Sequence, residues 1–187
     1  MELPNQNIVF FVSLKQLTSK VKISTFIQYI LKQNSMGATQ NTKWIKATPE
    51  RLYNAFATAE AIAAWFAPGE MTAKVHRFDF RVGGGYQMSL YYPGSDTTAK
   101  GKTSSKEDRY DAKFIELIPS EKIVQAIHFD SPDPAFSGEM IMEVTFEAQG
   151  DETKVSFTFS NIPEGIKPAD NEEGTRLTLE KLEKYVR

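Results

Sequence analysis

The sequence predicts an α+β domain in which a curved antiparallel sheet of about six to seven strands wraps around one long C-terminal helix. Between residues 71 and 161, apolar and polar residues alternate in short runs separated by Gly, Pro and polar turns, which is typical of half-buried antiparallel strands. After residue 168, apolar residues recur at helical spacing instead. Because this is the only long helix predicted beyond the sheet, it has to cover the sheet's apolar face.

The first predicted elements are one strand and two short helices. The strand covers residues 42–48. Thr48-Pro49-Glu50 then predicts a helix start, since it offers a threonine cap, a proline at the first helical position and an acid in the first turn. Thr58 caps a second short helix in the same way, with Glu60 in its first turn. Ala67-Pro68-Gly69 ends that helix.

Further strands and the terminal helix follow. The predicted strands cover residues 73–80, 86–92, 110–118, 122–129, 139–148 and 153–160, and the helix covers residues 168–187. Pro119-Ser120 and Gln149-Gly150-Asp151 supply the turns of two hairpins. The polar residues 94–105 and the proline-containing residues 130–134 are predicted to be loops.

The two strands around Gly83-Gly84-Gly85 carry the most informative pattern. Three successive glycines allow a sharp connection or a bulge that residues with a Cβ would resist. Alternation places five large side chains on one face of the strands: Phe78, Phe80, Tyr86, Met88 and Leu90. Such a face can line either a solid core or an apolar pocket, and the function depends on which of the two it is.

The composition limits both the domain organisation and the chemistry. Residues 1–36 are predicted to be a poorly packed N-terminal extension, and residues 37–187 a single domain. A net charge of −2 does not indicate the basic surface that is typical of nucleic-acid-binding proteins. The chain has no cysteine and only two histidines, so disulfides, thiol chemistry and a multi-histidine metal centre are excluded. No apolar run is long enough to span a membrane, and the expected location is cytoplasmic.

Several motifs occur in an order that resembles a known superfamily. They are TPERLYNAF (residues 48–56), WFAP (65–68), DFRVGG (79–84), IPSEKIV (118–124) and EEGTRLTLEKL (172–182). Together, over residues 42–187, they are similar to the START-like (SRPBCC, pollen-allergen-type) superfamily. The similarity is to the branch that contains homologues of the heat-shock protein 90 ATPase activator and polyketide cyclase-like proteins. Many members have Trp where this chain has Thr175.

The resemblance implies a helix-grip fold with an apolar cavity between the sheet and the C-terminal helix, in a superfamily of mixed functions. His76 is in phase with Phe78 and Phe80, so we expect it to face the interior, where it could orient a polar ligand group or act as a base. The alternative is a histidine near the strand end that reaches water. The predicted ligand-binding residues are His76, Phe78, Phe80, Tyr86, Met88, Tyr110, Met140, Met142, Phe157 and Phe159.

Other candidate groups favour structural interpretations. Gly83-Gly84-Gly85 is followed by a strand rather than by a helix N-terminus, so it does not predict phosphate binding. His128, at a strand end, is expected on the surface, and the charged run Lys106-Glu107-Asp108-Arg109 is expected to be a solvated strand start. No residues stand out as catalytic, and no metal or cofactor is predicted.

The sequence therefore predicts a non-catalytic protein that binds a small, largely apolar molecule between the sheet and the C-terminal helix. Two alternatives stay open. The first is an enzyme of the cyclase or hydrolase type that uses the same cavity. The second is a chaperone-associated interaction module similar to the heat-shock protein 90 ATPase activator, which would act through the outer face of its sheet.

Overall fold

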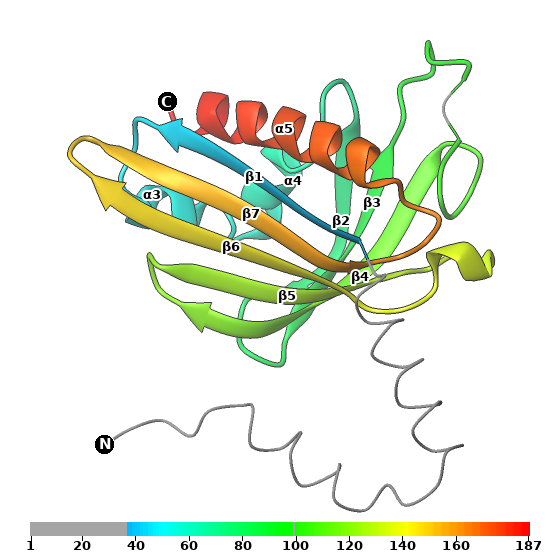
Figure 1. Cartoon of the computed structure of the whole chain (residues 1–187), viewed down its shortest axis with the longest axis horizontal. Helices are drawn as coiled ribbons and strands as arrows, with labels where there is room; N and C mark the ends of the chain where they lie inside the picture. Colours follow the sequence, from blue (N-terminus) through cyan, green and yellow to red (C-terminus); the bar gives the residue numbers. More distant parts are fainter. Residues whose placement is uncertain (1–36, 99) are drawn as a thin grey trace, which may run out of the picture. The chain divides into compact units, whose positions relative to one another are not determined.

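The computed structural model describes residues 37–98 and 100–187, so the predicted extension at residues 1–36 lies outside the described residues. In the described part, seven strands form one antiparallel sheet (Figure 1). The strands are β1 (Gly37–Ile45), β2 (Thr72–Asp79), β3 (Gly85–Tyr91), β4 (Glu107–Ile118), β5 (Lys122–Phe129), β6 (Met140–Gln149) and β7 (Glu152–Ile162). The helices are α3 (Pro49–Asn54), α4 (Ala59–Trp65), a 3₁₀ turn η1 (Pro134–Phe136) and α5 (Pro168–Tyr185).

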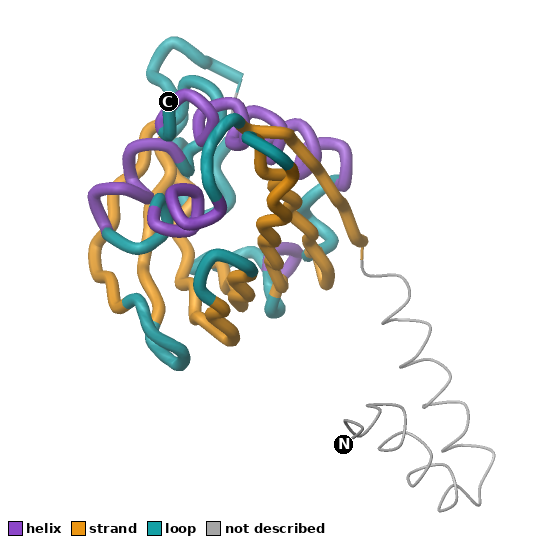
Figure 2. The backbone as a smooth tube through the Cα atoms, turned by 90° about the vertical axis from the view of Figure 1, so that its left-hand side faces the viewer, coloured by secondary structure: helices purple, strands orange, loops and turns teal. Residues whose placement is uncertain are grey.

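The sheet curves around the C-terminal helix, as predicted for a sheet that grips a helix. Its strand order is β1-β7-β6-β5-β4-β3-β2, so β2 to β7 follow one another in chain order and β1 pairs with the last strand. Figure 2 shows the strands curving away on both sides of α5, with α3 and α4 towards one edge. The predicted α+β class and helix-grip arrangement are confirmed.

The predicted helix caps are formed in the structure. The Thr48 hydroxyl accepts a hydrogen bond from the Arg51 amide at 3.2 Å, and the Thr58 hydroxyl accepts one from the Ala61 amide at 3.1 Å. Each bond satisfies an amide that has no partner within the first turn of the helix. The predicted range of β5 is also observed. By contrast, β1 begins at Gly37 and β4 at Glu107, both earlier than predicted, because backbone pairing continues into polar sequence.

An aromatic cluster fills one end of the space between the sheet and its helices. Phe56 packs edge-to-face on Trp65 with their ring centroids 4.7 Å apart, and the Trp65 indole donates to the Ala55 carbonyl at 2.9 Å. Phe80 packs edge-to-face on both Tyr53 and Phe114. Aromatic pairs of this kind add to the stabilisation from burial. This end of the domain is therefore a solid core.

A bulge in β2 corrects the expectation for His76. The pairing of β2 with β3 shifts register between Val75 and Arg77, so one extra residue lies in β2. His76 and Arg77 are both exposed, whereas Val75 and Phe78 point inward. The bulge interrupts the strict alternation that was used to place His76 in phase with Phe78. The expectation that His76 faces the interior is wrong.

The glycines between β2 and β3 have two separate structural roles. Gly83 has a φ of +80°, which lies in the left-handed region that side chains with a Cβ rarely adopt. Gly85 is needed for a different reason, because a Cβ at this position would lie 2.0 Å from the carbonyl oxygen of Ala112 on β4. The triple glycine therefore allows both a tight turn and a close approach of two neighbouring strands.

Replacing Gly85 by alanine should destabilise the fold strongly. The added methyl group would overlap the backbone of β4, so the two strands would have to separate, at a cost of about 2–4 kcal/mol in the free energy of unfolding. Gly94→Ala is the matched control, because a Cβ there meets nothing within 4 Å. It should leave stability unchanged or raise it by less than about 1 kcal/mol. Urea unfolding of the two variants checks this prediction, and equal midpoints would contradict it.

Candidate functional site

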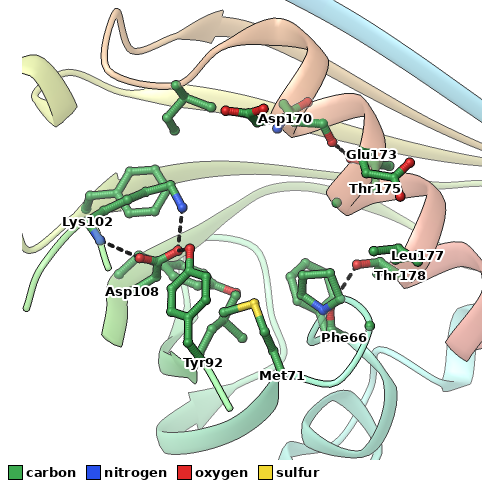
Figure 3. A pocket seen from close by; sticks show the side chains of 18 of the residues that line it. Phe66, Met71, Tyr92, Lys102, Asp108, Asp170, Glu173, Thr175, Leu177 and Thr178 are labelled. Carbon is green, nitrogen blue, oxygen red and sulfur yellow. Dashed lines mark hydrogen bonds and ion pairs between the residues drawn. The ribbon is translucent and has the colours of Figure 1, made fainter. Parts of the chain in front are cut away.

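A pocket of about 890 Å³ lies between the sheet and the N-terminal half of α5. Its sheet wall is made of inward-facing side chains from five strands: Leu90, Tyr110, Ile127, Phe129, Met140, Phe157 and Phe159. Phe66, which caps α4, and Met71, in the connection that follows, add to the lining (Figure 3). Most of this wall is apolar, so the pocket offers a largely hydrophobic surface.

Several of the α5 residues that line the pocket have small side chains or none. Gly174, Thr175 and Thr178 are of this kind, and Leu177 is a larger apolar residue among them. Further along the helix, Leu179 and Leu182 are fully buried and fill the space against the sheet. The Thr178 hydroxyl donates to the Phe66 carbonyl at 3.1 Å, which ties α5 to the end of α4. The helix therefore seals one half of the sheet face and leaves the other half hollow.

One corner of the pocket is polar and is built around Asp108. The Asp108 carboxylate accepts hydrogen bonds from the backbone amide of Lys102 at 2.5 Å and from the Tyr92 hydroxyl at 3.0 Å. It also forms an ion pair with the Lys102 ammonium group. Figure 3 shows these three side chains facing α5 across the pocket. Asp108 is only 3% exposed, and a carboxylate this deeply buried is tolerated because it is fully hydrogen-bonded and paired.

A second set of buried polar groups lies in the core, on the inner face of the sheet next to the pocket wall. Tyr110 is hydrogen-bonded to Tyr86 and donates to the Met88 sulfur at 3.1 Å. The Gln125 side chain donates to the Tyr86 hydroxyl at 3.0 Å. Burial raises the pKa of Tyr86 and of Tyr110, because the charged phenolate would be poorly solvated there. These hydrogen bonds therefore connect Tyr110, which lines the pocket, to Tyr86 and Gln125 in the core.

Negative charge predominates among the ionisable groups that line the pocket. Two lysines, Lys100 and Lys102, stand against five acids: Glu70, Asp96, Asp108, Asp170 and Glu173. Glu70, Asp170 and Glu173 are exposed at the mouth, and Arg176 pairs with Glu173. Burial raises the pKa of Tyr92, and the negative charges of Asp108, Asp96 and Asp170 raise it further. These acids therefore act on Tyr92 in the same direction as burial does.

The predicted ligand-binding residues fall into three groups. Tyr110, Met140, Phe157 and Phe159 line the pocket, so ligand contact at these positions stays a prediction. Five others belong to the core rather than to the pocket lining: Phe78, Phe80, Tyr86, Met88 and Met142. His76 lies on the outer side of the sheet and has no place in the pocket. The side chains of the two strands around the triple glycine therefore belong mainly to the core. Of these side chains, Leu90 near the end of β3 lines the pocket.

His76 belongs to a polar cluster on the outer face of the sheet. Its Nε2 lies 2.8 Å from the Ser89 hydroxyl, which in turn donates to Glu107 at 2.5 Å. Because the serine proton goes to the carboxylate, His76 Nε2 is the donor to Ser89 rather than its base. A catalytic triad needs the opposite order, with histidine between the serine and the acid. His128 is exposed, as expected.

Sequence reasoning missed the polar corner. Asp108 was expected in a solvated strand start, but it is buried, because β4 begins at Glu107 and carries Asp108 on its inner face. The spacing did contain a signal, since Asp108 has the same parity as the apolar residues Tyr110 and Phe114 further along the strand. No comparable signal identified Lys102, because it lies in an irregular connection.

The described part of the chain contains neither a candidate metal site nor a membrane-spanning helix. Within residues 37–98 and 100–187, no group of three or more His, Cys, Asp or Glu side chains is arranged to hold a metal ion. In the same part of the chain, no helix combines the length and the apolar character needed to cross a membrane.

The curved sheet, the gripped helix and the pocket between them define a helix-grip protein. A family model described as "Activator of Hsp90 ATPase homolog 1-like protein" matches residues 46–187. Since this match covers most of the chain, the protein belongs to that family, within the START-like superfamily that its motifs resemble. No curated protein matches the chain.

Solved structures show the same fold. The chain is similar to protein CV1439 from Chromobacterium violaceum, with 28% identity, a TM-score of 0.70, and coverage of 80% of this chain and 96% of that one. Protein Mll3558 from Rhizobium loti is 29% identical, with a TM-score of 0.61 and the same coverage. DynU16, a putative protein in the dynemicin biosynthetic locus, is 14% identical over 80% of this chain and 46% of its own, with a TM-score of 0.57. That last likeness shows the fold alone.

The buried tyrosines should ionise only when the protein unfolds in alkali. Tyr86, Tyr92 and Tyr110 have pKa values raised above the ordinary value of 10.0, so the unfolded chain loses these protons at a lower pH than the folded chain. Stability should therefore be complete below about pH 10 and fall above it. Phenolate absorbance and circular dichroism, followed together through an alkaline titration, check this.

The late part of the absorbance rise should coincide with the loss of circular dichroism. Tyr92→Phe should reduce the amplitude of the late absorbance rise by the contribution of one tyrosine, which assigns that part of the rise to Tyr92. If all tyrosines ionised near pH 10 while the circular dichroism stayed unchanged, the burial argument would be wrong.

Proposed function

We propose that this domain binds a small, largely apolar molecule in the pocket between the sheet and α5, without catalysing a reaction. The observation that carries the proposal is the pocket of about 890 Å³, which α5 covers with small side chains. The pocket is partly open to solvent, so a small molecule can enter it from outside. A cleft of this size with a mostly apolar lining therefore supports a binding role.

The chemistry of the lining supports the same proposal. Small-molecule sites in proteins typically have volumes of about 300–1,000 Å³, apolar walls and a few polar groups that fix the orientation of the ligand. Here the walls are aromatic, aliphatic and methionine side chains, and the polar groups lie together at Asp108, Lys102 and Tyr92. Met71 and Met140 add flexible side chains that can adapt to the shape of a ligand.

The first alternative is an enzyme of the cyclase or hydrolase type. The likeness to DynU16, which is described as a putative protein in a biosynthetic locus, shows the fold alone and does not favour this alternative. Such an enzyme requires an acid or base that is free to act in the pocket. Asp108 reaches the pocket but is already paired with Lys102 and hydrogen-bonded to Tyr92. His76 was the candidate from the sequence. His76 lies on the outer face and donates towards Ser89, which weighs against this alternative. The binding role is therefore the better supported of the two.

The second alternative is a chaperone-associated role in the cytoplasm, which the family's name supports. A docking surface would be expected to expose a continuous apolar or charged patch. The exposed large hydrophobic residues in the described part of the chain are Trp44, Val82, Ile115 and Tyr185, which come from different elements. Single exposed apolar residues are normal on soluble proteins. A chaperone partner is therefore the weaker proposal.

Filling the pocket from α5 should abolish ligand binding without unfolding the protein. A Cβ at Gly174 meets nothing within 4 Å, so Gly174→Leu places a large apolar side chain in the pocket without a backbone clash. It also replaces a poor helix former by a good one, which favours the folded state by up to about 1 kcal/mol. The variant should therefore melt at the same temperature or higher.

Native mass spectrometry of the freshly purified protein, followed by thermal shift with a panel of apolar compounds, measures the binding. The parent protein should carry or gain a ligand, and Gly174→Leu should lose it. Gly174→Ala is the matched control, because it makes the same gain in helix formation but leaves most of the pocket open. Equal binding by the leucine variant and the parent would contradict the proposed site. If no compound bound the parent, the proposed function itself would be wrong.

A further inference from the structure

We propose that the pocket selects its ligand by the charge of the ligand's polar group. It takes an apolar molecule whose polar group donates a hydrogen bond and carries no negative charge, such as an alcohol, a phenol or an amine, and it excludes carboxylates. This inference rests on the proposed binding function and adds the ligand class. Three features of the pocket carry it.

The first feature is that the lysine in the polar corner is already neutralised. The Lys102 ammonium group is paired with Asp108, and it lies 5.6 Å from the centroid of the Phe129 ring. The side chains of Asp108 and Lys102 are only 4% and 23% exposed, so both charges interact in a medium of low polarity, where the pairing is strong. A carboxylate ligand would have to compete with Asp108 for this lysine. It would also bring a second negative charge next to the first.

The second feature is that the corner can accept a hydrogen bond from a ligand. The Tyr92 hydroxyl gives its proton to Asp108, so its oxygen lone pairs are what it offers to the pocket. Asp108 itself also contributes carboxylate oxygens there. Lys102 has ammonium protons beyond the one it shares with Asp108, and these can donate to a ligand oxygen. A neutral hydroxyl can use both kinds of group, whereas a carboxylate can only accept.

The third feature is the sign of the charge at the mouth. Glu70, Asp96 and Asp170 line this side of the pocket. Their charges are partly offset by Lys100 in the lining and by Lys106 and Lys181 just outside it. Glu173 is offset by Arg176. Because the charges of Asp96 and Asp170 raise the pKa of Tyr92, their field reaches the polar corner. An anionic head group therefore meets repulsion as it enters and again where it binds.

A ligand series with one tail and three head groups tests the inference. The full chain is titrated with 1-decanol, decylamine and decanoate, and binding is measured by isothermal titration calorimetry below the aggregation concentration of each compound. We expect decanoate to bind at least about tenfold more weakly than 1-decanol, the size of effect expected of one unfavourable charge interaction at this range. The difference should shrink as the salt concentration rises, because salt screens the charges at the mouth.

Two sets of variants test the origin of the selectivity. Asp108→Asn leaves Lys102 without its partner, so decanoate should gain affinity, and adding Lys102→Met should remove that gain. Because Asp108 is buried, Asp108→Asn can also lower stability, so a second variant leaves the corner intact. It combines the exposed substitutions Glu70→Gln and Asp170→Asn, which should bring decanoate closer to 1-decanol. The control combines Glu147→Gln and Asp151→Asn, which remove the same charge from exposed positions outside the pocket lining.

The outcomes separate this inference from the proposed function. If decanoate bound the parent as tightly as 1-decanol, the head-group selectivity would be wrong, while the binding function would stand. If the mouth variant and its control gave the same affinities, the charges at the mouth would have no role and the inference would be overturned. If none of the three compounds bound, both the function and the inference would fail.

Discussion

The packing of α5 against the concave face of the sheet is the contact on which the rest of this structure depends. A sheet with one apolar face has to cover it, and here α5 shares that burial with the two short helices α3 and α4. The helix does so unevenly. Leu179, Leu182 and Val186 are buried against the strands, whereas Gly174 and Thr175 do not extend far enough to fill the space beneath them. The change of side-chain size along one face of one helix therefore divides the interior into a core and a pocket.

The remaining elements hold these two halves in place. At the filled end, Phe56, which follows α3, and Trp65 of α4 pack in an aromatic cluster with Phe146 of β6. At the open end, Asp108, near the start of β4, is bonded to Lys102 in the connection that precedes the strand. A buried carboxylate is costly unless it is paired and hydrogen-bonded, so the same contacts that make this corner polar also attach Lys102 to β4.

The sequence predicted the fold well because the fold depends on periodicity. Alternating residues defined the strands, and the threonine caps at Thr48 and Thr58 defined the short helices. The site was harder to predict. The bulge at His76 adds one residue to β2, so an inward position became an outward one, and nothing in the alternation reports an insertion of this kind. Asp108 could have been placed by its parity with Tyr110, but its partners come from Tyr92 and Lys102, and only the folded chain brings them together.

The residues of the packed core and the residues of the pocket lining overlap only in part. The residues that determine the sheet, such as Gly85 and the aromatic cluster, contribute little to the pocket lining. The pocket lining combines strand side chains that also belong to the core, such as Tyr110 and Phe157, with short side chains on α5 and side chains from irregular connections. Substitutions at Thr175 can therefore change the size of the pocket while leaving the strands unchanged. Family membership therefore accounts for the fold, whereas the residues that line the pocket determine its size and polarity in this chain.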